Sequence, residues 1–186
     1  MPGRAVSFVN GEFYHIYNRG NEKREIFTQT RDYTRFLKTI FYYQFAGSRP
    51  SFSKFSKSKI SFLKPLGEEK LVEMICYCLM PNHFHFLIRQ LKENGISKVI
   101  SQISNSYTKY FNTKYRRVGS LLQGTFKAVH IESEEQLIHV SRYIHLNPIV
   151  SGLVDNLEHY QWSSYLEYIK PINSFCSVNE ILGIFS

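Results

Sequence analysis

The chain has 186 residues and a formal net charge of +8 at pH 7, and 43% of its residues are hydrophobic. This length suits one domain with a buried core, and the composition excludes a disordered or fibrous chain. The charge favours a polyanionic partner, with nucleic acid ahead of an anionic membrane surface. The alternative interpretation is a basic protein that binds no polyanion.

Signals for export or membrane insertion are absent from the sequence. No apolar run approaches the roughly 20 residues that span a bilayer, and the N-terminal residues lack a signal-type apolar core. The three cysteines are an odd number and do not suggest a disulfide framework. Cys76 and Cys78 would share a strand face with Met80, where packing is their expected role. We therefore expect a cytoplasmic protein that does not bind a membrane.

Residues 11–20 are the first predicted element. They are rich in strand formers and end in an Asn-Arg-Gly-Asn turn signal. Arg19 and Arg24 lie near Gly20, where the backbone has room to admit a phosphate. A solvated turn explains the same residues.

A helix and a hairpin follow. From Thr30 apolar residues recur at intervals of three and four, which predicts a helix that has Thr30 as N-cap and ends before Gly47. Residues 71–79 and 83–90 then predict two strands joined by a tight turn.

Residues 51–64, between that helix and the hairpin, combine serine, lysine and phenylalanine without an acidic residue. This composition predicts a basic loop inserted into the domain. Interleaved phenylalanine and lysine would suit single-stranded nucleic acid, because bases stack on aromatic rings and phosphates attract cations. A loop with no specific role fits equally. We otherwise treat residues 1–186 as a single domain.

Residues 95–115 predict a second helix with an apolar stripe. Lys109, Arg116 and Arg117 make its end strongly positive. These cations either complement the helix dipole or bind phosphates. Residues 121–131, which include Lys127, predict a fourth strand.

The last predicted helix begins at a capping box, with Ser133 at the N-cap and Gln136 at the third helical position. It should run to Asn147 and be disturbed by Pro148, which lacks a backbone N–H. Up to this helix, the order strand, helix, two strands, helix and strand is that of the ferredoxin-like α+β fold. We expect an antiparallel sheet with those helices on one face.

Residues 76–89 contain two histidines in an otherwise apolar run. In a strand, His83 and His85 would share one face about 6–7 Å apart, while Phe84 and Phe86 point to the core. Two imidazoles so placed suit a metal ion. Ordinary packing is the competing interpretation.

The last helix carries a second pair of polar residues. Tyr143 and Asn147 are four residues apart and share a helix face about 6 Å apart along the axis. If that face covers the histidines, two nitrogens, an amide oxygen and a phenol meet at one cation. Such a cation keeps open positions for phosphate oxygens and would polarise a phosphodiester. Attack by tyrosine would then give a covalent phosphotyrosine. The rival nucleophiles on the preceding helix are Tyr107, Tyr110 and Tyr115.

Residues 81–87 resemble the His-hydrophobic-His (HUH) motif of single-tyrosine transposases, especially the REP-associated tyrosine transposases. Further segments resemble this family in the same order along the chain, namely residues 14–21 with 26–27, 123–127, 142–148 and 162–165. One departure is Thr125, which stands where many relatives have an arginine and puts a DNA backbone contact in doubt.

The resemblance implies a metal-dependent transposase that cleaves and rejoins single-stranded DNA near hairpins such as REP-like palindromes. Tyr143 would attack the scissile phosphate and leave a 5′-phosphotyrosine and a free 3′-hydroxyl. His83 and His85 would bind Mg²⁺ or Mn²⁺, with Asn147 as the third ligand. The family resemblance leaves open whether the protein is a monomer or a homodimer.

The cations that we expect to contact DNA are Arg19, Arg24, Lys109, Arg116, Arg117, Lys127 and Arg142. The leading alternative is a noncatalytic domain that binds single-stranded or hairpin nucleic acid while the histidines merely pack. A histidine-triad nucleotide hydrolase is opposed by Leu87, which occupies the position of its third histidine. A zinc hydrolase lacks its accompanying ligand motif.

Overall fold

The computed structural model describes residues 6–47, 52, 69–170 and 175–185. Its strands are β1 (Phe13–Arg19), β2 (Val72–Met80), β3 (His83–Gln90) and β4 (Lys127–Ile131). Its α-helices are α1 (Thr30–Tyr43), α3 (Gly95–Lys114), α4 (Glu134–Val150), α5 (Tyr165–Ile169) and α6 (Asn179–Leu182). Short 3₁₀ turns are η1 (Asn21–Lys23), η2 (Leu157–His159) and η3 (Gly183–Phe185).

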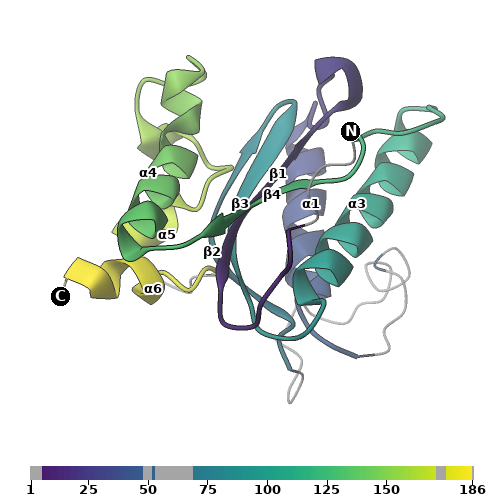
Figure 1. Cartoon of the computed structure of the whole chain (residues 1–186). Coiled ribbons are helices and arrows are strands. Elements are labelled where there is room, and N and C mark those ends of the chain that lie inside the picture. The colour runs from purple at the N-terminus through teal and green to yellow at the C-terminus, as the bar shows by residue number, and fades with distance from the viewer. Residues whose placement is uncertain (1–5, 48–51, 53–68, 171–174, 186) are drawn as a thin grey trace.

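The four strands form one antiparallel sheet in the order β2-β3-β1-β4. This strand order is that of the ferredoxin-like fold, so the predicted α+β class is confirmed. Helices α1 and α3 cover one face, as the sequence indicates, whereas α4, α5 and α6 lie on the other side of the sheet (Figure 1). The predicted nucleophile helix therefore lies on the sheet face opposite α1 and α3. Among the described residues, no helix has the length and apolar character to cross a bilayer.

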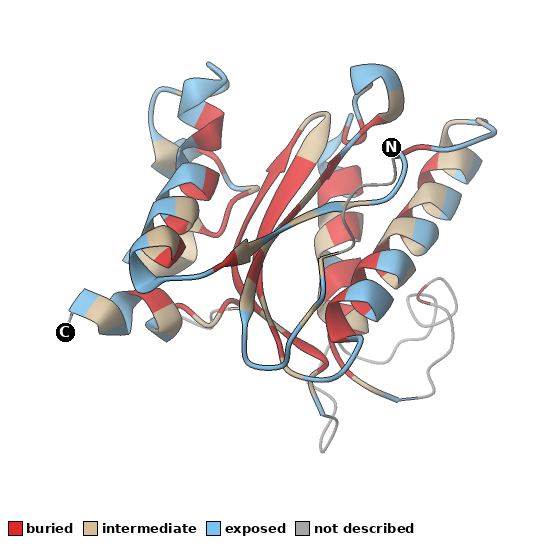
Figure 2. Ribbon diagram, in the orientation of Figure 1, coloured by how far each residue is buried: buried red, intermediate tan, exposed pale blue. Residues whose placement is uncertain are grey.

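The face under α1 and α3 is closed by aromatic packing. Phe84 and Phe86 on β3 point to this face and are fully buried, and Figure 2 shows that most of β2 and β3 is buried. Phe36 of α1 packs on both rings, with centroids 5.3 and 6.1 Å away, and on Tyr107 of α3 at 4.8 Å. This is the core that the period-2 pattern of β3 predicts.

A buried carboxylate ties α1 to the end of α3. Asp32 has no exposed surface, and it accepts hydrogen bonds from Lys114 at 2.6 Å, Tyr115 at 2.6 Å and Tyr110 at 2.9 Å. Thr28 also donates to it. Burial by itself raises the pKa of Asp32, but these hydrogen bonds outweigh it and lower the pKa to about 2.

Three predicted boundaries change in the structure. The N-cap of α1 is Gln29, whose side chain forms a capping box with Asp32, so Thr30 is already helical. Strand β4 is shorter than the predicted 121–131, because Leu121 instead accepts a backbone hydrogen bond from the turn after β1. Helix α4 continues through Pro148 to Val150, since proline lies in the last turn, where only one helical hydrogen bond is lost.

Residues 162–164 extend the sheet beyond β2. Trp162 accepts from the backbone of Leu79, and the Ser164 N–H donates to Tyr77. The Trp162 ring stacks on Tyr33 with centroids 4.5 Å apart. This C-terminal segment therefore packs against the body of the domain.

The predicted basic loop at residues 51–64 lies outside the described residues except for Phe52. Phe52 is buried at 1% exposure, with the Arg35 guanidinium 4.0 Å from its ring. This phenylalanine is therefore packed and does not present a ring for base stacking. The single-domain assignment of residues 1–186 stays a prediction.

Candidate active site

The register of β1 and β3 places a cluster of rings on the sheet face under α4. Tyr17 lies opposite His85, and Arg19 lies opposite His83. Because side chains alternate along a strand, His15, Tyr17 and Arg19 share the face of the two histidines. The His83 and His85 ring centroids are 5.0 Å apart. The sequence prediction that both share one face is confirmed.

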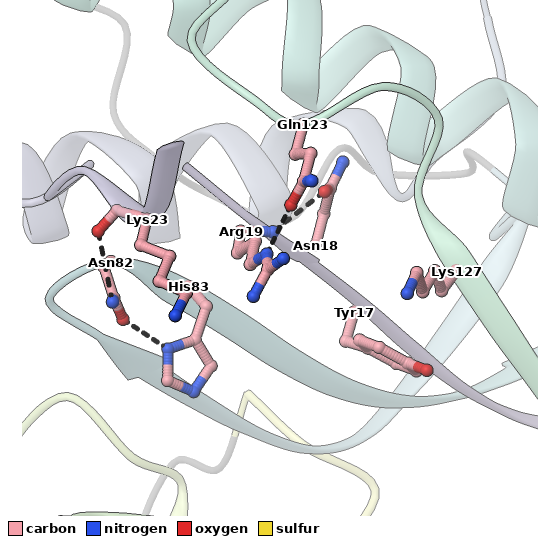
Figure 3. Close-up of a pocket in the computed structure, with 8 residues that line it drawn as sticks. All are labelled: Tyr17, Asn18, Arg19, Lys23, Asn82, His83, Gln123 and Lys127. Atoms are coloured by element: carbon pink, nitrogen blue, oxygen red, sulfur yellow. Dashed lines mark hydrogen bonds between the residues drawn. The ribbon is translucent and has the colours of Figure 1, made fainter. Parts of the chain in front are cut away.

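His83 is oriented by its neighbour in the hairpin turn. Its Nδ1 lies 2.6 Å from Oδ1 of Asn82, whose amide nitrogen donates to the Lys23 carbonyl at 3.3 Å (Figure 3). Since a carbonyl oxygen only accepts, Nδ1 of His83 carries the proton. Nε2 of His83 is left with a lone pair, which is the state that a metal ligand needs.

His85 is held by a third histidine that sequence reasoning did not assign to the site. Nε2 of His15 lies 2.8 Å from Nδ1 of His85, and the two rings stack with centroids 5.1 Å apart. His85 is buried at 6% exposure, and His15 is half-buried. A signal was present in the sequence, because His15, Tyr17 and Arg19 alternate in the first strand. The pairing register alone shows which face they share.

Burial keeps this cluster neutral. It lowers the pKa of His15 to about 4, and together with nearby His15 and His83 it lowers the pKa of His85 to about 3. Burial and the Arg19 charge also lower the pKa of His83. Neutral imidazoles at pH 7 have lone pairs available for a cation.

Tyr143 of α4 lies over the histidines. Its ring centroid is 5.6 Å from His85 and 6.0 Å from His15, in edge-to-face contact with both. The side chain is 52% exposed, so it is open to solvent. The structure thus brings the predicted nucleophile and the histidine pair together within one chain.

Two contacts fix α4 on the sheet. Ile144 is fully buried in the cluster that includes Cys76, Cys78 and Leu87. Nε2 of His145 lies 2.9 Å from the Ser164 hydroxyl. All three cysteines are free and buried, and burial raises the pKa of Cys76 to about 12, which is consistent with the predicted packing role of Cys76 and Cys78.

Asn147 follows Tyr143 by one helical turn and is buried at 8% exposure. Its amide nitrogen donates to the Tyr143 carbonyl at 2.7 Å, a bond that does not use the amide oxygen. Within the described ranges, no three His, Cys, Asp or Glu side chains gather into a metal site. Two neutral imidazoles therefore fit a divalent cation only if an amide oxygen or the substrate completes the ligand set. Ligation by Asn147 stays a prediction.

A cavity of about 500 Å³ opens beside His83 (Figure 3). Its wall includes the cations Arg19, Lys23 and Lys127 and the ring of Tyr17. The Arg19 Nε donates to Gln123, and the Lys127 ammonium lies 6.0 Å from the Tyr17 ring centroid. Positive charge beside an apolar ring suits a nucleotide, which offers a phosphate and a base.

Gly20 shapes the turn that brings Arg19 and Lys23 to this cavity. A Cβ atom at Gly20 would lie 2.1 Å from the carbonyl oxygen of Arg24. The turn therefore requires glycine at this position because of close backbone approach.

The other predicted DNA contacts are divided between the two sides of the sheet. Arg142 is exposed beside Tyr143, whereas Arg24 lies 3.4 Å from the Glu22 carboxylate. Lys109 is exposed on α3, on the far side of the sheet from α4, and the chain continues from α3 into Arg116 and Arg117. The structure does not bring these last three cations to the histidine cluster.

The rival tyrosines also lie on the α1 and α3 side. The Tyr107 hydroxyl donates to the Ile26 carbonyl, and those of Tyr110 and Tyr115 donate to Asp32. Their hydroxyls make hydrogen bonds that stabilise the fold, and the sheet separates them from the histidines. Tyr143 alone of the four candidates contacts the histidine cluster.

Comparisons with known proteins bear on the family and the fold of the chain. The family model of IS200-like transposases matches residues 48–147. A solved structure of a REP-associated tyrosine transposase bound to a REP hairpin is similar in fold, with a TM-score of 0.61 and 16% identity; the match covers 91% of this chain and 86% of that one. A candidate transposase from Deinococcus radiodurans R1 matches with a TM-score of 0.43 and 10% identity, over 77% of this chain and 95% of that one. A search of curated protein sequences finds no match.

The matched family segment spans more than half of the chain and contains the histidine pair, Tyr143 and Asn147. The resemblance that the sequence motifs indicate is thereby confirmed. The chain belongs to the IS200-like transposase family.

Proposed function

We propose that this transposase cleaves and rejoins single-stranded DNA beside a hairpin through a 5′-phosphotyrosine on Tyr143. The observation that carries the proposal is the contact between the exposed Tyr143 ring and His85, with centroids 5.6 Å apart. It joins the nucleophile to a pair of neutral imidazoles. The net charge of +8 and the cationic cavity beside His83 support a DNA substrate.

In the proposed step, the Tyr143 hydroxyl oxygen forms a bond to the scissile phosphorus as the bond from phosphorus to the 3′-oxygen breaks. The phenol gives up its proton, and the departing 3′-oxygen gains one. Attack of a 3′-hydroxyl on the phosphotyrosine reverses the exchange and rejoins a strand. The covalent bond conserves the energy that hydrolysis would lose.

His83 and His85 would hold Mg²⁺ or Mn²⁺, with Asn147 as the proposed third ligand. When bound, such an ion supplies Lewis-acid polarisation of the phosphate oxygens. The residues of the chain do the remaining work. Arg19 and Lys127 hold the DNA backbone beside His83, and α4 sets the Tyr143 hydroxyl against the phosphate.

The test of the nucleophile is a covalent trap. Wild-type protein incubated with labelled hairpin-bearing single-stranded DNA and Mg²⁺ or Mn²⁺ should give an adduct that survives denaturation. Tyr143→Phe should eliminate it, because the ring keeps its packing while the attacking oxygen is removed. Tyr165→Phe, at a tyrosine of the C-terminal segment, is the matched control and should leave the adduct unchanged. An adduct that persists in Tyr143→Phe would contradict the assignment.

The test of the histidine pair separates binding from chemistry. His83→Ala and His85→Ala should abolish cleavage but retain DNA binding, since the cations of the cavity remain. Unchanged cleavage in both would remove the metal role. If the wild type bound many hairpin DNAs but cleaved none of them with any metal ion, the result would favour the noncatalytic DNA-binding domain.

A further inference from the structure

His15 has a role that neither the motifs nor the proposed step uses. It lies on β1 in the middle of the sheet, and its Nε2 is 2.8 Å from Nδ1 of His85. This contact occupies Nδ1 of His85. Only Nε2 of His85 is then left for a cation.

The direction of this hydrogen bond decides whether His85 is a competent ligand. One proton lies between the two nitrogens. If His15 donates it, the neutral His85 must carry its own proton on Nε2, which blocks coordination there. If His85 donates it, Nε2 of His85 has a free lone pair.

We infer that His15 is a positioning residue that accepts the Nδ1 proton of His85 and so presents Nε2 of His85 to the metal. This inference rests on the proposed metal role of the histidine pair. His15 does for His85 what Asn82 does for His83, where the acceptor is an amide oxygen at 2.6 Å. Acceptors of this kind fix both the tautomer and the ring orientation of metal-bound histidines.

The surroundings of His15 hold its ring in place against His85. Its ring stacks on His85 and lies 5.0 Å from the Tyr17 ring, with Tyr143 edge-on at 6.0 Å. The ring therefore cannot swing away without disturbing three neighbours. His130, on the next strand, shows the contrast. It is on the other face of the sheet, beside Tyr14, and its Nε2 lies 3.1 Å from the Glu12 carboxylate.

The experiment measures Mn²⁺ binding to the DNA-free full-length chain by electron paramagnetic resonance of the free ion. His15→Phe keeps a ring of similar size but removes the acceptor, and it should weaken Mn²⁺ binding at least about tenfold. His15→Gln places an amide oxygen near the former Nε2 and should recover most of the affinity. His130→Phe is the matched control and should bind Mn²⁺ as the wild type does.

A second measurement reads the proton directly. In Mg²⁺-saturated wild-type protein, ¹⁵N chemical shifts of the imidazoles should show His15 protonated on Nδ1 and bare on Nε2. A packing role would not require that tautomer. This measurement needs no variant, so it decides the matter even if His15→Phe does not fold.

Three results would overturn the inference. These are wild-type Mn²⁺ affinity in a folded His15→Phe, equal loss in His15→Phe and His15→Gln, or a proton on Nε2 of His15 in the Mg²⁺-loaded protein. Failure of the proposed metal site looks different. In that case the wild type itself would not bind Mn²⁺, or His83→Ala would bind it unchanged.

Discussion

The two faces of the sheet differ in how they are packed and in how polar they are. The face under α1 and α3 is closed, with Phe36, Phe84 and Phe86 fully buried and Asp32 hydrogen-bonded to donors at the end of α3. The face under α4 carries polar rings beside an open cavity, and its outermost ring, Tyr143, is half exposed. Packing that stabilises the fold is thus concentrated on the side away from the chemistry. This separation lets the histidine face keep buried nitrogens free for a ligand.

The largest effect should come from breaking the closed face at its buried carboxylate. Asp32→Asn removes the charge partner of Lys114 and replaces one acceptor oxygen with an NH₂ donor that faces other donors. We expect the free energy of unfolding to fall by about 3 kcal/mol, the scale for a buried ion pair that loses one member. Urea denaturation followed by circular dichroism measures it. Glu25→Gln, at an exposed residue before α1, should change the free energy of unfolding by less than about 0.5 kcal/mol.

On the open face the same measurement should show little change. His83→Ala removes a half-buried ring from the rim of the cavity, so cleavage should be lost while stability stays within about 1 kcal/mol of wild type. If His83→Ala destabilised the protein as much as Asp32→Asn, the conclusion that stability depends mainly on the α1 and α3 face would be wrong.

The two faces should also begin to lose stability to acid at different pH values. The folded pKa values of His15 and His145, about 4 for each, lie below the ordinary value of 6.5, so the unfolded chain binds more protons than the folded one between pH 6.5 and 4. His85, with a folded pKa of about 3, extends this window to lower pH. Stability should therefore fall as pH drops through that window, by at most about 1.4 kcal/mol per pH unit for each histidine. Asp32 has a folded pKa of about 2, against an ordinary value of 3.8, so its titration affects stability at lower pH. Its contribution is complete above pH 4 and is lost as pH falls toward 2.

Unfolding measured from pH 7.5 to 2.5 in metal-free buffer tests this difference. His145→Gln should reduce the fall in stability only between pH 6.5 and 4. Asp32→Asn should reduce it only below pH 4. A profile that is flat between pH 6.5 and 4 in the wild type would show that the histidines are protonated freely in the fold.

The smallest effect is expected at the cationic wall of the cavity. Lys127→Gln should weaken single-stranded DNA binding and reduce the slope of log affinity against log salt by about 0.7, the value for one phosphate contact to a single strand. Fluorescence anisotropy between 50 and 300 mM salt measures the slope. The control is Lys98→Gln at the exposed start of α3, which should leave it unchanged. Equal slopes in Lys127→Gln and wild type would remove the phosphate contact.

Local patterns in the sequence were enough to predict most elements of the fold. Alternation in residues 83–90 predicted β3 and its buried face, and Ser133 predicted the start of α4, where it accepts from the Gln136 backbone at 3.1 Å. These features depend on neighbours in the chain, so periodicity and capping reveal them. The start of β4 and the course of α4 past Pro148 were missed, because tertiary contacts and the position within the last turn decided them.

The sequence by itself determined that His83 and His85 share a face and that Tyr143 and Asn147 lie one turn apart. Only the tertiary structure decided that Tyr143 lies over His85, that the three rival tyrosines are across the sheet, and that His15 contacts His85. The physical reason is that alternation and helical spacing fix directions within one element. Which elements meet depends on strand register and on the face that each helix covers, and both are set by contacts between residues far apart in the chain.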